Sequence, residues 1–301
     1  GRSTPSALQG VIEGSDLIID LGGLVMEDLN TGLWSGRLGV SRVVALHADW
    51  VQAGHQVFTS VSLSDVLIGL IARFKTGSTQ RSYWGDARFV QPEPLLPVTG
   101  DPHEPTSSAG FYPRLQRFLR PTDLLISDTG SCLLKLNSLR LPSDVAIESQ
   151  TLWSSIGWAT PAALGCALAC NDRRVVLVTG DGAHQFTAQE IGVMGFIDVS
   201  PVVIVLNNGL YGVEALISEV GHAYNNIPVW RYADMPETLG CHGWWCGKAS
   251  SLAELDQAFA AINHHSGAAY LEILIPPEES QPLGDELIET MHQTQTPKTM
   301  S

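Results

Sequence analysis

The chain of 301 residues is acidic, with 17 Lys and Arg against 31 Asp and Glu and a formal net charge of −14. This balance argues against a nucleic-acid-binding protein, which needs a basic face. No apolar run approaches the ~20 residues of a membrane-spanning helix, so we expect no membrane segment.

Five cysteines, an odd number without paired spacing, fit a reducing cytoplasm. Cys166 and Cys170 stand one helical turn apart and are predicted to pack as small apolar residues. Cys241-His242 together with Cys246 leaves a metal site open as an alternative, although no second pair has the spacing of a zinc site.

Residues 1–75 are predicted to form a short α/β piece. DLIIDLGG and RVVALHAD have the pattern of apolar strands, and SLSDVLIGLIARF that of an amphipathic helix with a serine cap. So few elements are too little for a domain, which indicates the C-terminal part of a larger one. Residues 76–107 are rich in proline and are predicted to be a linker.

Residues 108–283 alternate between helix and strand patterns. The expected helices are FYPRLQRFL, IGWATPAALGCALAC, TAQEIGVMGFI and SLAELDQAFAAINHH, and the expected strands are DLLISD, DVAIES, VVLVTGDG, PVVIVLNN and AAYLEILIP. Near-continuous apolar strands separated by helices predict an α/β fold, a doubly wound parallel sheet covered on both faces. Residues 284–301 are predicted to be a polar tail.

Two short polar turns follow apolar strands in this region. Gly180-Asp181-Gly182 follows VVLVT, and Asn207-Asn208 ends PVVIVL, so Asp181 and Asn208 stand 27 positions apart. Each turn is predicted at the carboxyl end of a parallel strand, where open α/β sheets bind their ligands. A carboxylate, an amide oxygen and backbone carbonyls suit Mg²⁺, a hard cation often shared with phosphate oxygens. Gly182 lets the backbone approach an anion, and the following helix offers its first N–H groups.

GDG, a spacer of this length and a closing NN resemble the thiamine diphosphate signature. Two unrelated turns are the alternative, since Asp-Gly and Asn-Gly are common turn formers, but residue type, spacing and strand context agree. From about Val11 to Leu283 the chain is similar to the 2-oxo acid decarboxylases, such as pyruvate decarboxylase and indolepyruvate decarboxylase. The similarity is carried by SDLIIDLGGLVMEDLNTG, SDTGS, LWSSIGWATPAALGCALA, GDGAHQFTAQEIGVMGF, LNNGLYGVEALI and YNNIPVW. It implies the end of the middle domain, followed by the diphosphate-binding domain.

The resemblance implies thiamine diphosphate as cofactor, held through Mg²⁺. Asp181 and Asn208 would bind Mg²⁺ through their side chains, and Leu210 through its backbone carbonyl. Ile156 would be the bulky residue that bends the cofactor. The carbonyl of Ser154, where the family usually has glycine, would accept a hydrogen bond from the pyrimidine amino group. The other residues expected at the cofactor are Thr129, Gly130, Ser131, Ser155, Gly180, Gly182, Ala183, Tyr211, Gly212 and Val213.

Glu214, in NNGLYGVE, is the candidate catalytic residue. By the resemblance, the decarboxylase branch has a glutamate at this point and acetolactate-synthase-like relatives do not. After CO₂ leaves, a proton must be delivered, and a carboxylic acid with a raised pKa in an apolar pocket can supply it. Val213 and Ile217 would line the pocket with apolar side chains. The structural alternative is a glutamate favoured near a helix N-terminus by the helix dipole.

The resemblance also implies that the N-terminal half of a family member is absent here. The glutamate that contacts N1′ of the pyrimidine, and the pyrimidine-binding domain that carries it, would come from another chain or fragment. We therefore expect a homo- or hetero-oligomer, a dimer or tetramer, that converts a 2-oxo acid to an aldehyde and CO₂. Two alternatives stay open: a thiamine diphosphate-dependent carboligase that forms acyloins, and a catalytically inert cofactor-binding or scaffold subunit.

Overall fold

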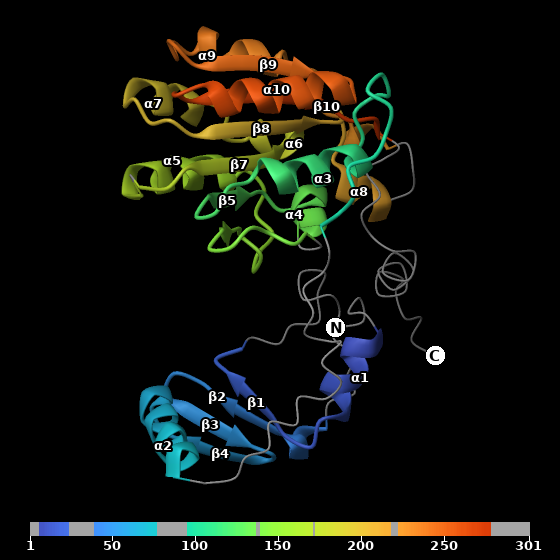
Figure 1. Cartoon of the computed structure of the whole chain (residues 1–301). Coiled ribbons are helices and arrows are strands. Elements are labelled where there is room, and N and C mark those ends of the chain that lie inside the picture. The colour runs from blue at the N-terminus through green and yellow to red at the C-terminus, as the bar shows by residue number, and fades with distance from the viewer. Residues whose placement is uncertain are drawn as a thin grey trace. The chain divides into compact units, whose positions relative to one another are not determined.

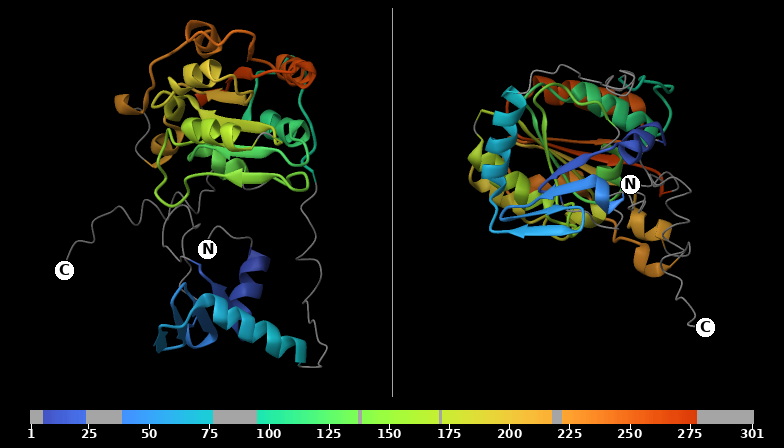
Figure 2. Two further views of the ribbon diagram at one scale, coloured as in Figure 1. Left: turned by 90° about the vertical axis from the view of Figure 1, so that its left-hand side faces the viewer. Right: turned by 90° about the horizontal axis from the view of Figure 1, so that it is seen from below.

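The chain divides into two compact units, residues 1–91 and 92–301, in a computed structural model (Figures 1 and 2). The structure describes residues 6–23, 39–76, 95–136, 139–170, 172–217 and 222–277. The predicted tail and most of the predicted linker lie outside these ranges. Within them, no helix combines the length and apolar character that crossing a membrane requires.

The first unit is a small mixed sheet with two helices. Its strands are ordered β1-β2-β3-β4, with β1 and β2 parallel and the other neighbours antiparallel. The strands are β1 (Ile18–Leu21), β2 (Val43–Leu46), β3 (Trp50–Ala53) and β4 (Gln56–Thr59), and the helices are α1 (Ser6–Gly14) and α2 (Leu63–Thr76). The predicted strands correspond to β1 and β2, and the predicted helix to α2. The hairpin β3-β4 and the helix α1 were not predicted.

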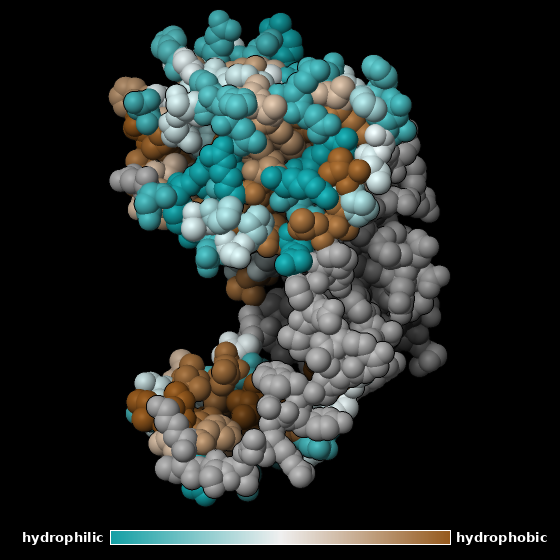
Figure 3. Space-filling model, viewed as in Figure 1, coloured by the Kyte–Doolittle hydropathy of each residue, from teal (hydrophilic) through white to brown (hydrophobic). Residues whose placement is uncertain are grey.

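This unit has a very small core. Among its described residues, the buried side chains are Leu46 and Val51. Apolar side chains are instead exposed on it, and the face seen in Figure 3 carries a brown patch. The exposed apolar residues of this unit include Val57, Phe58, Ile68, Ile71 and Phe74.

The second unit is built on a six-stranded sheet in the order β6-β5-β7-β8-β10-β9. Every neighbouring pair is parallel, which confirms the predicted doubly wound parallel sheet. The strands are β5 (Leu124–Ser127), β6 (Ala146–Glu148), β7 (Val175–Gly180), β8 (Val202–Asn207), β9 (Trp245–Ala249) and β10 (Ala269–Leu274). Edge strand β9 was not predicted.

Helices cover both faces of this sheet because successive strand residues point to opposite sides. Val176 and Val178 of β7 belong to one buried cluster, and Val175 and Leu177 belong to the other. The first cluster includes residues of α3 (Ser108–Phe118), α4 (Ser131–Leu136) and α10 (Leu252–His264), and the second includes residues of α5 (Ala159–Ala169), α7 (Glu190–Phe196) and α9 (Met235–Thr238).

The strand order reverses between β5 and β7. From β5 the chain continues to β6 on one side, and then returns to place β7 on the other side of β5. The helices that follow β5 and precede β7 lie on opposite faces, since α4 contributes to one cluster and α5 to the other. Open α/β sheets bind ligands in the crevice at the carboxyl ends of strands beside such a reversal.

Part of the segment expected to be a linker belongs to the second unit and is hydrogen-bonded to the residues that start α10. The N–H of Thr106 donates to the carbonyl of Ser250, 3.0 Å away, and the N–H of Leu252 donates to the carbonyl of Glu104, also 3.0 Å away. Ser251 then starts α10 with a capping box that it forms with Glu254. Residues 95–107 therefore run along the edge of this unit at the start of α10.

Candidate functional site

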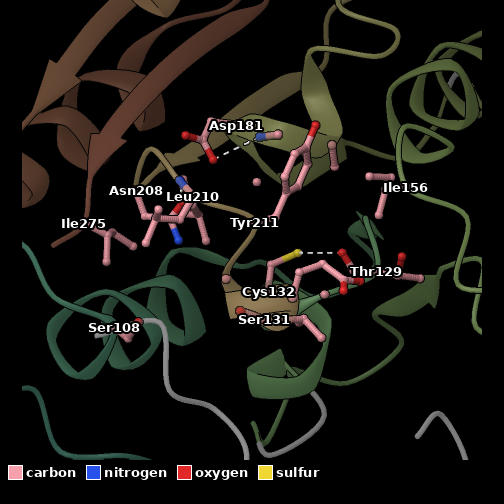
Figure 4. A pocket seen from close by; sticks show the side chains of 18 of the residues that line it. Ser108, Thr129, Ser131, Cys132, Ile156, Asp181, Asn208, Leu210, Tyr211 and Ile275 are labelled. Carbon is pink, nitrogen blue, oxygen red and sulfur yellow. Dashed lines mark hydrogen bonds between the residues drawn. The ribbon is translucent and has the colours of Figure 1, made fainter. Parts of the chain in front are cut away.

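A pocket opens at the carboxyl ends of β5, β7 and β8, and Figure 4 shows its lining side chains. All of the predicted site residues line it except Ser154 and Ser155. Those that line it are Thr129, Gly130, Ser131, Ile156, Gly180, Asp181, Gly182, Ala183, Asn208, Leu210, Tyr211, Gly212, Val213 and Glu214. Segments that lie far apart in the sequence thus meet at the strand-order reversal.

Asp181 directly follows β7 and is the first residue of the turn after that strand. Its carboxylate is buried and accepts hydrogen bonds from the N–H of Gly182 at 3.0 Å and from the N–H of Gly209 at 2.8 Å. Burial raises the pKa of the Asp181 carboxyl to about 6, although these N–H groups favour its charged form. One carboxylate therefore connects the turn after β7 to the turn after β8.

The turn after β8 presents Asn208 and Leu210 to the pocket. The amide oxygen of Asn208 accepts a hydrogen bond from the N–H of Leu210 at 3.1 Å. Asn207, in contrast, donates to the buried Glu272 on β10, with 2.8 Å between Nδ2 and Oε1. The first asparagine of the pair thus anchors the turn, and the second faces the pocket.

Gly182 is packed tightly by two side chains. A β-carbon on Gly182 would lie 2.5 Å from Cε1 of Tyr211 and 2.6 Å from Cδ1 of Ile227, so a larger residue would displace both. The helical residues directly after β7 form only a single turn, α6 (Asp181–His184). The next helix, α7, begins six residues after α6 ends, at Glu190.

The loop before α5 brings Ile156 to the pocket. Ser154 in this loop has a φ of 53°, in the left-handed region that favours glycine. That conformation gives a physical reason for the glycine that the resemblance expects at this position. Ser154 and Ser155 are exposed, and Ile156, with 40% of its surface exposed, lines the wall.

Glu214 lies in the first turn of α8 (Gly212–Ile217) and lines the pocket. Its side chain is exposed in this chain, whereas the preceding Val213 is half-buried. The expected contribution of Ile217 to the wall concerns a side chain outside those that the structure describes.

Comparison with known proteins agrees with this geometry. Residues 128–273 match the family described as "Thiamine pyrophosphate enzyme, C-terminal TPP binding domain", thiamine pyrophosphate being another name for thiamine diphosphate. Residues 128–273 belong to this family of thiamine pyrophosphate-binding domains. The resemblance inferred from GDG and NN is therefore confirmed.

Relatives of the chain include two proteins named alpha-keto-acid decarboxylase. The one from Mycobacterium ulcerans (strain Agy99) is 32% identical over 289 residues, which cover 96% of this chain and 50% of the relative. The one from Mycobacterium leprae (strain TN) is 31% identical over 277 residues, which cover 92% and 48%. The chain spans about half the length of these relatives.

Solved structures show the same fold. Benzoylformate decarboxylase from Polynucleobacter necessarius gives a TM-score of 0.66 at 18% identity, over 90% of this chain and 51% of that one. A putative thiamin diphosphate-dependent enzyme from Mycobacterium smegmatis gives 0.63 at 19% identity, with the same coverage.

The pocket of this thiamine pyrophosphate-binding domain fits a diphosphate and a hard cation. The hydroxyl of Thr129 is buried at the pocket wall without a hydrogen-bond partner among the described residues, so it can donate to an anion. The carboxylate of Asp181 and the amide oxygen of Asn208 are the oxygen donors that Mg²⁺ prefers. These observations supply both an anion donor and metal ligands within one pocket.

Sequence reasoning missed several residues of the wall. They are Ser108 and Tyr112 of α3, Cys132 of α4, Leu206 of β8 and Ile275 after β10. Cys132 is buried, and burial raises its pKa to about 12, so its thiol stays protonated and donates to the carbonyl of Asp128 at 2.9 Å. Its place directly after SDTGS, next to Ser131, was the signal that could have found it.

The alternative metal ligands that the sequence suggested, Cys241, His242 and Cys246, do not form a metal-binding group among the described residues. Cys241 is buried, and its thiol donates to the carbonyl of Ile191 at 3.2 Å. Cys246 is exposed on β9. Among the residues that the structure describes, no group of three or more His, Cys, Asp or Glu side chains is arranged to hold a metal ion.

His184 ends the short helix α6 but faces the protein interior. It is fully buried, with Nδ1 at 3.0 Å from the hydroxyl of Thr160 and Nε2 at 2.8 Å from that of Tyr270. Burial lowers the pKa of His184 to about 4, so the folded protein keeps its imidazole neutral. We therefore assign His184 to packing of the sheet and not to the pocket.

This burial predicts a pH dependence of stability. Between pH 6.5 and 4 the unfolded chain binds a proton at His184 that the folded chain does not, so stability is full above pH 6.5 and falls as the pH drops towards 4. At about 1.4 kcal/mol per pKa unit, the loss is about 3 kcal/mol. His184→Gln should remove this part of the slope when unfolding by denaturant is measured across the range. The exposed His242 gives the control His242→Gln, which should keep the slope; equal slopes for all three proteins would contradict the assignment.

Proposed function

We propose that this chain is the diphosphate- and Mg²⁺-binding half of a non-oxidative 2-oxo acid decarboxylase. The reaction would convert a 2-oxo acid to an aldehyde and CO₂. The observation that carries the proposal is that Asp181, Asn208, Thr129 and Glu214 all line one pocket. The names of the two mycobacterial relatives support the same reaction class.

The residues of the pocket divide into those that bind and one that moves a proton. Asp181, Asn208 and the carbonyl of Leu210 would hold Mg²⁺, and the donors of Thr129 and the turn after β7 would hold the diphosphate. Thiamine diphosphate, when bound, supplies an electron sink at the substrate carbon while CO₂ departs. Glu214 would then deliver a proton to that carbon, and Ile156 would fix the cofactor's orientation.

The proposal requires a second component. A chain or fragment with the pyrimidine-binding domain, and its glutamate for N1′, would complete the site in a dimer or tetramer. The length of the relatives, about twice that of this chain, supports this requirement. We also propose a cytoplasmic location, because all five cysteines are free.

The test combines this chain with a pyrimidine-binding half. With thiamine diphosphate, Mg²⁺ and a panel of aliphatic and aryl 2-oxo acids, the assembly should release CO₂ and aldehyde in equal amounts, and this chain alone should release neither. Light scattering should show a dimer or tetramer. Acyloin in place of aldehyde would favour a carboligase, and an assembly that binds cofactor without releasing CO₂ would favour a scaffold subunit.

A further inference from the structure

A second buried aspartate lies at the carboxyl end of β5, one strand away from Asp181. Asp128 is 1% exposed, and its side chain does not line the pocket. Its Oδ1 accepts a hydrogen bond from the N–H of Gly157 at 3.1 Å, and its Oδ2 accepts one from the hydroxyl of Thr179 on β7 at 3.3 Å. One carboxylate thus joins the ends of two strands to the loop before α5.

The peptide groups of Gly157 are held from two directions. Its N–H donates to Asp128, and its carbonyl accepts from the hydroxyl of Thr187 at 2.7 Å. Its φ is 82°, and a β-carbon there would lie 2.7 Å from Cβ of Phe186, so only glycine fits. Gly157 is therefore a fixed point of the loop, and Ile156, the residue directly before it, faces the pocket.

We propose that Asp128 is a positioning residue for the cofactor site: by holding the N–H of Gly157, it sets the side chain of Ile156 against the space that the thiamine part of the cofactor occupies. The role of Ile156 rests on the proposed function, whereas the anchoring of the loop rests on the geometry alone. The side chain of Asp128 does not line the pocket and has no hydrogen bond to a predicted metal ligand, so its proposed action on the site runs through Gly157.

The position of this carboxylate indicates that it serves the loop and not only the stability of the sheet. It lies at the ligand-binding end of β5, whereas the buried Asp123 at the opposite end of the same strand pairs with Arg174. Burial raises the pKa of Asp128 to about 6, while the N–H of Gly157 and the hydroxyl of Thr179 favour the charged form. Asp123 therefore offers a matched control: it is a buried aspartate directly before β5, at the end of the strand away from the pocket.

The anchoring is tested on the full chain without cofactor by hydrogen exchange resolved to single amides. In Asp128→Ala, the amides of residues 155–157 should exchange at least tenfold faster than in the wild type. Asp128→Asn keeps an acceptor for the N–H of Gly157 and should stay within threefold of the wild type. Asp123→Ala should leave these amides unchanged. If Asp128→Ala does not fold, Thr187→Val releases the carbonyl of Gly157 and should speed exchange in the same residues.

The positioning is tested by two ligands, with the pyrimidine-binding half present. Inorganic pyrophosphate with Mg²⁺ uses the Asp181 end of the pocket, and thiamine diphosphate also needs Ile156. Asp128→Ala should lower the affinity for thiamine diphosphate at least tenfold and the affinity for pyrophosphate less than twofold. Asp123→Ala should change neither affinity by more than twofold. In an Ile156→Ala background, Asp128→Ala should have no further effect on thiamine diphosphate.

Three results would overturn the role of Asp128. The first is an unchanged exchange rate of the amides of residues 155–157 in Asp128→Ala. The second is an equal loss of affinity for both ligands. The third is that Asp128→Ala and Ile156→Ala have additive effects on the affinity for thiamine diphosphate. A wild-type assembly that binds neither ligand would instead refute the proposed function, and the exchange experiment would still decide whether Asp128 anchors the loop.

Discussion

Replacing Asp181 with alanine should abolish Mg²⁺-dependent binding of thiamine diphosphate. The carboxylate is the one anionic metal ligand that we assign, and it also accepts the N–H groups of Gly182 and Gly209, which connect the turns after β7 and β8. Its loss removes a ligand and separates the two turns that hold the metal. Because outer-shell changes alone cost about 10–100-fold in metal affinity, we expect a loss of at least about 100-fold.

Calorimetric titration with thiamine diphosphate, with Mg²⁺ and with EDTA, measures this loss in the assembled protein. Asp123→Ala removes a buried aspartate from the opposite end of the sheet and should retain the affinity. If Asp181→Ala bound the cofactor with Mg²⁺ as tightly as the wild type, the metal site would have to lie elsewhere.

Replacing Glu214 with glutamine should leave cofactor affinity within about twofold and lower kcat by about 100-fold or more, the range for loss of a general acid or base. Glutamine keeps the size of the side chain at the start of α8 but has no acidic proton to transfer. Glu214 is exposed in this chain, so we expect the pyrimidine-binding half to cover it and to exclude water from it.

The measurement is steady-state turnover of the assembled enzyme together with a cofactor titration. Glu237→Gln is a matched control, because Glu237 is likewise exposed in the first turn of a short helix, α9, but lies outside the pocket. Unchanged turnover in Glu214→Gln would leave the structural alternative, a glutamate favoured by the helix dipole.

The sheet that carries the site could be predicted because its central strands are buried on both faces. Strands β5, β7, β8 and β10 each have an almost continuous apolar run, which is the pattern of a parallel sheet. Strand β9 lacks it: WCGKA places a glycine and a lysine in an edge strand whose partner, β10, follows it in the sequence. The hairpin β3-β4 was marked only by Gly54, which has a φ of 59°.

The site could be predicted where a turn follows a strand, and not where a helix or a distant segment adds a wall. Asp181 and Asn208 are polar residues after apolar strands. Tyr112 and Ile275 belong to ordinary apolar patterns, and their place at the pocket depends on packing that no local pattern encodes. Asp128 followed the same rule as Asp181, an acidic residue directly after a buried strand, but SDTGS was interpreted only from its threonine onward.

The small core of the first unit has a thermodynamic consequence. A sheet whose described residues bury little more than Leu46 and Val51 gains little hydrophobic free energy, whereas the second unit closes two clusters around its parallel strands. Heating should therefore melt the chain in two steps, and a single midpoint temperature would describe neither. At temperatures between the steps, protease should digest the first 91 residues while the cofactor pocket persists.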